Sequence, residues 1–277
     1  MRVRLVTALT VLATLLLAVA CAGTTGRPEG GAADPDAADS GRADADTETT
    51  STPLRGELLV FAAASLTDVF EELGSLLEDA HPELTVTFNL AGSQTLAGQL
   101  VEGAPADVFA SASGTQMDAV AEEGLVDEPV PFATNRLAIV VEPDNPLGIR
   151  TLDDLARDDV VLVLAGEEVP AGQYAAQALE QAGVEVSPAS LEVDVRAVLG
   201  KVVLGEADAA IVYESDVVVA GDTVQGIDIP DGDNVFATYP VATVTDARNP
   251  DAAAAFVDLL RSPEGTEVLE RYGFGVP

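Results

Sequence analysis

The sequence predicts an α/β fold. Short apolar stretches alternate with segments in which apolar residues recur at helical spacing, and this alternation continues from Glu57 to the end of the chain. Strands that alternate with helical patterns of roughly 10–15 residues are typical of α/β sheets. About 220 residues are enough for one sheet or for two lobes, and no internal repeat is visible.

The first elements follow from apolar spacing. Residues 58–63 form a short apolar strand, and the apolar residues of 66–77 recur every three or four positions, as in a helix. Residues 84–91 alternate as in a half-buried strand. A helix is then expected over 94–103 and a strand over 107–112.

The middle of the chain continues the alternation. Residues 136–143 form a long apolar strand, and Thr151, followed three residues later by an aspartate, is a plausible helix start. A strand over 160–165 and a helix after Pro170 come next. A further helix is expected over 194–205.

The last elements include one with a clear start signal. Residues 209–218 continue the alternation, and 239–245 is expected to be a strand. Two helices follow, over 251–260 and 263–271. The second has Ser262 as its N-cap and a proline at its first position.

Charge narrows the choice of partners. The chain has a formal charge of −34, with 13 basic residues. Nucleic acid and anionic membrane surfaces are not expected as partners, because both require a basic face. Such an acidic surface is more typical of solubility at high salt.

The start of the chain predicts export. Residues 1–20 have a basic start and an apolar run, which indicates a secretory signal peptide. "LAVAC" resembles a bacterial lipobox, so Cys21 is expected to be acylated, the alternative being an ordinary cysteine in a leader that is cleaved elsewhere or not at all. As Cys21 is the only cysteine, an intrachain disulfide and a thiolate metal site are excluded. Residues 21–56 are almost devoid of apolar side chains and are expected to form a disordered, lipid-attached tether.

Few residues suit catalysis or metal binding. The single histidine, His81, precedes a proline in a turn context and is expected to be a solvated loop residue. Without a second histidine, Ser-His-Asp and Cys-His nucleophiles and common zinc sites are absent, so a secreted hydrolase is disfavoured. An acidic surface module that binds calcium through "PDGDN" (230–234) stays open as an alternative, although the full calcium-loop spacing is missing.

Four predicted helix starts carry small or apolar residues. They are Ser65, Ser93, Ala171 and Val195. The first turn of a helix leaves backbone N–H groups unpaired and carries a partial positive charge, so several such starts can together bind an anion. Taken singly, Ser65 and Ser93 would more often be ordinary N-caps.

Five segments, in order and with suitable spacing, resemble a known family. The similarity to the periplasmic molybdate-binding proteins, the ModA family of ABC-importer receptors, spans Glu57 to Phe274. It is carried by "VFAAASLTDVF", "AGSQTLAGQLVEGAPADVFASA", "VPAGQYAAQAL", "DVRAVLGKVVLGEADAAIVYESD" and "ERYGF".

The resemblance implies a two-lobed, type II periplasmic-binding-protein fold. Each lobe would be a mixed, mainly parallel sheet flanked by helices. Lobe 1 would comprise residues 57–135 and 238–277, and lobe 2 residues 136–237. The chain would cross between the lobes near 133–137 and 236–239, and the lobes would close on the ligand by a hinge motion.

The resemblance also implies a site for a tetrahedral oxyanion. Ser65 and Ser93 would give hydroxyl and N–H groups, Ala171 and Val195 backbone N–H groups, and Tyr213 its hydroxyl. On residue type alone, Tyr213 would more often be a core tyrosine.

Three neighbouring residues are given other roles. Arg196 is expected to form a structural ion pair rather than to bind the ligand, because neutral donors avoid burying a guanidinium. Asp107 is expected to be structural or interlobe. Gln94 departs from the family pattern, in which a further small residue is common.

By the same resemblance the protein would not be an enzyme. It would capture molybdate, and tungstate, without a cofactor or direct protein–metal ligands, and deliver it as a monomer to a molybdate ABC-transporter permease. Its place would be outside the cytoplasm, anchored through lipidated Cys21, or in the periplasm. The nearest alternative is a receptor for sulfate, thiosulfate or phosphate.

Overall fold

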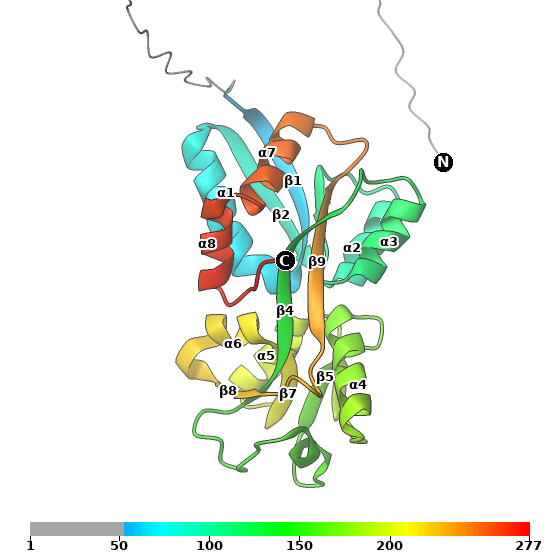
Figure 1. Cartoon of the computed structure of the whole chain (residues 1–277), viewed down its shortest axis with the longest axis vertical. Coiled ribbons are helices and arrows are strands. Elements are labelled where there is room, and N and C mark those ends of the chain that lie inside the picture. Colours follow the sequence, from blue (N-terminus) through cyan, green and yellow to red (C-terminus); the bar gives the residue numbers. More distant parts are fainter. Residues whose placement is uncertain (1–52) are drawn as a thin grey trace, which may run out of the picture. The chain divides into compact units, whose positions relative to one another are not determined.

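The protein's structure, a computed structural model, describes residues 53–277 (Figure 1). The predicted leader, Cys21 and residues 21–52 of the predicted tether lie outside the described residues. Within the described part, strands and helices alternate and nine strands join in one mixed sheet, as the α/β prediction requires. In residues 53–277 there is no helix with the length and apolarity that a membrane span requires.

The sheet combines parallel and antiparallel pairing. Its order is β2-β1-β3-β9-β4-β7-β5-β6, and β8 also pairs with β4. Neighbours are parallel within β1–β3 and within β5–β7, whereas β4 and β9 run antiparallel to their neighbours. The strands are β1 (Arg55–Ala63), β2 (Glu83–Ala91), β3 (Val108–Ala110), β4 (Val130–Val141), β5 (Leu162–Ala165), β6 (Ser190–Glu192), β7 (Ala209–Tyr213), β8 (Gln225–Asp228) and β9 (Phe236–Thr243).

Helices cover both faces of the sheet. In Figure 1, α1, α7 and α8 lie on one side of β1, β2 and β9, and α2 and α3 lie on the other. Helices α4, α5 and α6 pack on β4, β5 and β7. The α-helices are α1 (Thr67–Ala80), α2 (Ser93–Val101), α3 (Gly114–Glu122), α4 (Pro170–Ala182), α5 (Val195–Val203), α6 (Glu214–Ala220), α7 (Pro250–Leu260) and α8 (Pro263–Arg271), with 3-10 turns η1 (Ala64–Leu66), η2 (Leu152–Ala156) and η3 (Gly221–Thr223).

Strand β1 is apolar on both faces because helices cover both. Val60 joins a core cluster with Phe70 of α1 and Phe256 of α7, whose rings lie 5.3 Å apart. The next residue, Phe61, joins a second cluster with Leu96 of α2. A strand buried on both faces is expected to be continuously apolar rather than alternating.

Strand β4 changes partners along its length. Its first part, Val130–Arg136, pairs with β9, and its second part, from Leu137, pairs with β7 and β8. This change falls inside the predicted crossover segment 133–137. We keep the names lobe 1 and lobe 2 for the two predicted ranges, whose boundaries stay a prediction.

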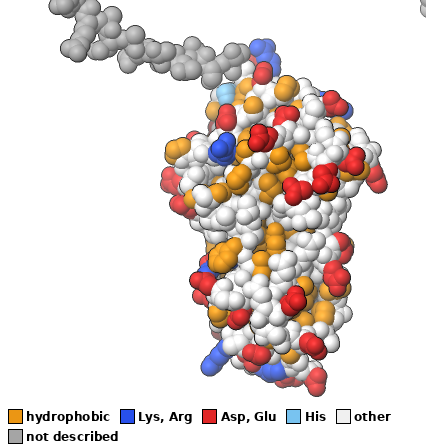
Figure 2. All heavy atoms as spheres, turned by 45° about the vertical axis from the view of Figure 1, so that its right-hand side comes forward, with side chains coloured by type: hydrophobic (Ala, Val, Ile, Leu, Met, Phe, Trp, Pro, Cys, Tyr) orange, Lys and Arg blue, Asp and Glu red, His pale blue; other side chains and the backbone are white. Residues whose placement is uncertain are grey.

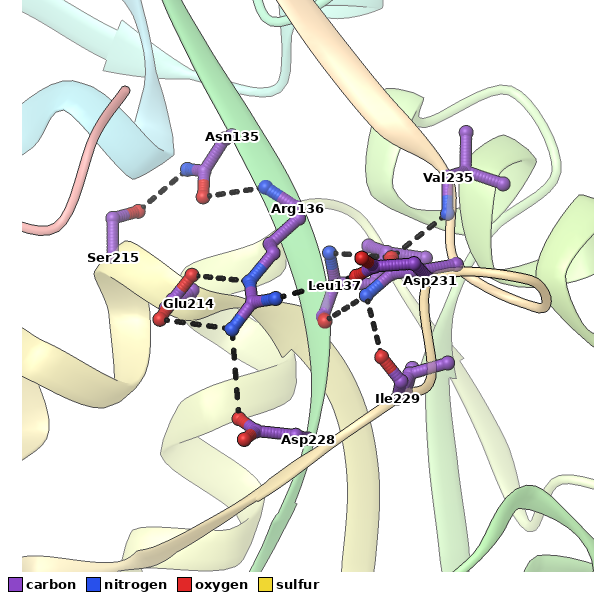
Figure 3. Close-up of polar contacts among 10 residues, drawn as sticks. Asn135, Arg136, Leu137, Glu214, Ser215, Asp228, Ile229, Asp231 and Val235 are labelled. Atoms are coloured by element: carbon purple, nitrogen blue, oxygen red, sulfur yellow. Dashed lines mark hydrogen bonds and ion pairs between the residues drawn. The ribbon is translucent and has the colours of Figure 1, made fainter.

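A polar cluster surrounds this change of partner (Figure 3). The buried Asn234 side chain accepts the Leu137 N–H at 3.0 Å and donates to the Leu137 carbonyl at 2.9 Å, so it pairs with β4 as a strand would. Arg136 donates to Glu214 at 2.6 Å and lies near Asp228 and Asp231. These contacts fix the backbone where the chain passes between the two ranges.

The structure corrects several element boundaries. Strand β1 begins at Arg55, two residues before the predicted start of lobe 1 at Glu57, because the ladder with β2 includes Arg55 and Gly56. Strand β4 begins at Val130 instead of 136. The predicted helix after Thr151 is only the 3-10 turn η2, although the predicted start is confirmed by a capping box. The elements α3, β6, β8 and η3 were not predicted, and residues 209–218, taken together in the prediction, divide into β7 and the start of α6.

Candidate oxyanion-binding site

The predicted site residues meet at one small cavity between lobe 1 and lobe 2. The cavity volume is about 10 Å³, close to the space that one water molecule needs. Its lining includes all five residues expected to hold an oxyanion. The full lining is Ala63, Ala64, Ser65, Gly92, Ser93, Ala112, Val169, Pro170, Ala171, Asp194, Val195 and Tyr213.

The helix starts at this cavity largely lack capping side chains. The residues that precede η1, α2 and α4 are Ala63, Gly92 and Val169, and none of them makes a side-chain cap hydrogen bond. Only Asp194, before α5, caps its helix, through the Ala197 N–H at 2.8 Å. Backbone N–H groups at the other starts are therefore available to a ligand.

Neither serine is an N-cap, and each hydroxyl is held by a neighbour. Ser93 is the first residue of α2, and its Oγ accepts the Ala112 N–H at 3.0 Å. Ser65 lies within η1, and its Oγ is hydrogen-bonded to the Tyr239 hydroxyl at 3.0 Å. The Ser93 hydroxyl therefore keeps its own proton to donate, and Ser65 does so when Tyr239 is the donor of their bond.

Tyr213 ends β7 with its side chain buried. Its hydroxyl has no hydrogen-bond partner within the described residues, although it is fully enclosed. Burial raises the pKa of Tyr213 well above its ordinary value, and burial likewise raises the pKa of Tyr239. Both hydroxyls therefore stay protonated at neutral pH, and the Tyr213 hydroxyl can donate to a ligand.

Among the cavity's lining residues there is no basic side chain. Arg196, next to Val195, is paired with carboxylates instead. Its Nη2 donates to Asp68 at 2.6 Å, and its Nε lies 3.0 Å from Asp216. The expectation that Arg196 forms ion pairs is confirmed, and any anion in the cavity would be held by neutral donors.

Asp107 is structural, as expected. Its buried carboxylate accepts the N–H groups of Leu59, Arg248 and Asn249 at 2.6–3.0 Å. It thereby joins the edge of β1 to the loop before α7. Asp107 does not line the cavity.

The calcium alternative gains no support from the described residues. In "PDGDN", Asp231 faces Arg136 at 3.6 Å, and the Asn234 side chain is engaged with the backbone. Residues 53–277 contain no cluster of three or more His, Cys, Asp or Glu side chains that could hold a metal ion.

Three residues near the cavity were not predicted from the sequence to have a role there. Tyr239 supports Ser65 from β9, and Asp216 accepts the Tyr213 N–H at 3.1 Å. Gly172 gives α4 a close approach to the end of β5. Gln94, the departure from the family pattern, donates to the Val193 carbonyl at 2.9 Å, from lobe 1 to lobe 2. The roles of Tyr239 and Gln94 depend on segments far apart in the chain, so they have no local sequence signal. The Asp216–Tyr213 contact spans only three residues, and Gly172 approaches the nearby residues 165 and 166.

A mixed α/β fold with a small cavity at several helix starts suits a solute-binding protein. Residues 58–275 match the family model described as bacterial extracellular solute-binding protein. The chain belongs to that family and, within it, groups with the ModA proteins.

Curated relatives and solved structures agree with this placement. The chain is 38% identical to the molybdate-binding protein ModA of Mycobacterium tuberculosis over 79% of this chain and 85% of the relative. It is 33% identical to the Escherichia coli protein of that name, over 80% of this chain and 90% of the relative. The solved substrate-binding domain of a putative molybdenum ABC transporter from Clostridium difficile superposes with a TM-score of 0.61 and is 29% identical in sequence. The match covers 80% of this chain and 99% of that domain. The Azotobacter vinelandii periplasmic molybdate-binding protein shares the fold, with a TM-score of 0.71 and 17% sequence identity. The match covers 79% of this chain and 99% of that protein.

Proposed function

We propose that this protein is an extracytoplasmic receptor that captures molybdate, and tungstate, and delivers it to an ABC permease. Its relatives at 38% and 33% identity are named molybdate-binding proteins. The observation that carries the proposal is the convergence of Ser65, Ser93, Ala171, Val195 and Tyr213 on one cavity without a basic side chain.

The donor set suits a fully deprotonated tetrahedral anion. Backbone N–H groups and a neutral tyrosine hydroxyl offer protons, and the N–H groups carry no lone pair for an acidic O–H. Hydrogen phosphate would therefore lose one bond and meet repulsion. Sulfate carries no proton either, so cavity size has to separate it from molybdate.

Short-range bonds have to supply the affinity, since the surface charge is unfavourable. Figure 2 shows Asp and Glu side chains scattered over this face, with few Lys or Arg. Surface charge is largely screened beyond about 8 Å at physiological ionic strength. Charge-assisted hydrogen bonds each contribute roughly 1.5–3 kcal/mol, so several can support a dissociation constant between nanomolar and micromolar.

Side-by-side calorimetric titrations test the ligand. Molybdate and tungstate are expected to bind in the nanomolar-to-micromolar range, and sulfate, thiosulfate and phosphate at least about 100-fold more weakly. Tighter binding of sulfate or phosphate would replace the proposed ligand with that anion. Indifference to all five, together with stabilisation by calcium, would favour the calcium-binding alternative.

Replacing Tyr213 by phenylalanine tests the site directly. The hydroxyl is buried and has no partner among the described residues, so its loss is not expected to destabilise the ligand-free protein. Molybdate affinity is expected to fall about 10- to 100-fold. Calorimetry and thermal melts of Tyr213→Phe measure the two effects separately.

The matched control removes a tyrosine hydroxyl outside the cavity. Tyr272, at the end of α8, does not line the cavity, so Tyr272→Phe is expected to keep the wild-type affinity. Equal affinities for the wild-type protein and Tyr213→Phe would remove Tyr213 from the site.

The proposal includes location and mode of action. The protein would reach the outer face of the membrane through residues 1–20, stay attached through acylated Cys21, and act as a monomer without catalysis or a cofactor. The family description, an extracellular solute-binding protein, supports the location. Mass spectrometry of the mature N-terminus tests the anchor: the expected mass corresponds to a chain that begins at an acylated Cys21.

A further inference from the structure

One ion pair connects lobe 1 and lobe 2 beside the cavity. Arg196 is the second residue of α5 and follows Val195, and its Nη2 donates to the Asp68 carboxylate at 2.6 Å. Asp68 is the second residue of α1, three positions after Ser65. Helix α5 packs against η1, the turn that carries Ser65. Both partners therefore lie within three residues of a proposed ligand donor.

The second partner of Arg196 ties it to Tyr213. The Arg196 Nε lies 3.0 Å from Oδ1 of Asp216, a fully buried residue of lobe 2. The other Asp216 oxygen accepts the N–H of Tyr213 at 3.1 Å. The guanidinium, 23% exposed, thus lies between a carboxylate of lobe 1 and a carboxylate of lobe 2.

This pair is unusual among the ion pairs of the molecule. Within residues 53–277, the other ion pairs, including Arg136–Glu214 and Arg271–Glu72, join residues of the same lobe. Among the ion pairs of the described part of the chain, Arg196–Asp68 is the one that joins the two lobes. Another polar contact between the two ranges, from Gln94 to the Val193 carbonyl, is uncharged.

Both lobes are strongly negative, so an ion pair between them can reduce their mutual repulsion. Lobe 1 contains 20 acidic and 3 basic residues, and lobe 2 contains 20 acidic and 5 basic residues. Closing two strongly negative bodies on a doubly negative ion brings like charges together, and this repulsion opposes closure. A cation held between carboxylates of both lobes offsets part of it.

We infer that Arg196 is a positioning residue that latches the closed cleft by pairing with Asp68 across it. The inference rests on the proposed function. Because the pair needs both lobes in contact, it stabilises the closed state and not the open one, so it strengthens ligand retention without touching the ligand. Release of the ion requires this pair to break.

Neutralising Asp68 tests the latch. Asp68→Asn keeps the size of the side chain and removes its charge. Molybdate affinity is expected to fall about three- to tenfold, mainly through faster dissociation. The melting temperature of the ligand-free protein is expected to fall by no more than about 2 °C, whereas the increase caused by saturating molybdate becomes smaller. Asp68→Glu, which restores the charge, is expected to recover part of the loss.

Helix α1 also offers a matched control. Glu72 pairs with Arg271 at 2.7 Å within lobe 1, so Glu72→Gln removes a similar ion pair without affecting the cleft. Its affinity and dissociation rate are expected to match the wild type. A dissociation rate for Asp68→Asn that equals that of Glu72→Gln would overturn the latch.

A measurement without ligand separates the latch from the proposed function. Small-angle scattering of the ligand-free full chain is expected to give a larger radius of gyration for Asp68→Asn than for the wild type. If the wild type binds no oxyanion, the proposed function fails and the scattering difference alone decides the latch. If the wild type binds and Asp68→Asn changes neither dissociation nor radius, the latch fails and the proposed function stands.

Discussion

Replacing Gly172 by alanine is expected to weaken molybdate binding about 100-fold or more and to lower the free energy of unfolding by about 2–4 kcal/mol. Gly172 is the third residue of α4, directly after the proposed donor Ala171. An added Cβ would lie 2.0 Å from the Gly166 carbonyl oxygen and 2.5 Å from that of Ala165. These are backbone atoms at the end of β5, so the start of α4 has to move away from the cavity.

The effect on binding follows from the displaced donors. If the first turn of α4 shifts, the Ala171 N–H no longer points into the cavity, and neighbouring contacts weaken with it. The loss of one or two charge-assisted hydrogen bonds corresponds to a decrease in affinity of about 100-fold or more. Urea denaturation measures the stability of Gly172→Ala, and calorimetry measures its binding.

A helical glycine of α5 provides the control. An alanine Cβ at Gly200 would meet no atom within 4 Å. Gly200→Ala is therefore expected to raise the free energy of unfolding by about 0.5–1 kcal/mol, because alanine is the better helix former. Its affinity is expected to stay that of the wild type. A Gly172→Ala protein as stable and as tightly binding as Gly200→Ala would contradict the packing argument.

Elements with local end signals were predictable from the sequence. Helix α8 begins as expected, with the Ser262 hydroxyl accepting the Gly265 N–H at 3.0 Å and Pro263 at the first position. Helix α4 likewise begins at Pro170. Such signals act within one helical turn, so no knowledge of distant segments is needed.

Elements defined by distant partners were missed. The first part of β4 contains Pro131, which argues against a central strand, and the structure accommodates it where the register with β9 shifts. Strand β6 has three residues and pairs only with β5 among the described strands. Helix α3 turns only Met117 and Val120 into the core, so its apolar spacing is weak. In each case the tertiary partner decides the structure.

At the candidate site, too, some residues were predictable from the sequence and some contacts were not. The resemblance named the residues at the helix starts, since these lie within the matching segments. It did not give the support of Ser65 by Tyr239, because that contact depends on how β9 packs at the cavity. The acceptance of the Tyr213 N–H by Asp216 is a local contact over three residues that was not predicted. The sequence also offered no measure of how closely α4 approaches β5 at Gly172.

Replacing Asp216 by asparagine is expected to change how stability depends on pH. Asp216 is fully buried, and burial raises its pKa from 3.8 to about 6, although Arg196 and the Tyr213 N–H favour the charged form. Between these two pKa values the folded protein holds a proton that the unfolded chain releases, so this residue makes stability fall as pH rises from about 4 to 6. Above about pH 7 its contribution is constant.

The difference in the free energy of unfolding between Asp216→Asn and the wild type isolates the contribution of Asp216. Asparagine does not titrate, so the free energy of unfolding of Asp216→Asn minus that of the wild type is expected to rise by about 2 kcal/mol between pH 4 and pH 6. Urea denaturation at several pH values measures it. Asp159→Asn is the control: Arg157 lowers the pKa of this exposed carboxyl, so its difference is expected to be small and to fall as pH rises. A flat difference for Asp216→Asn would mean that Arg196 fully offsets the burial of this carboxylate, and that Asp216 stays charged across the whole range.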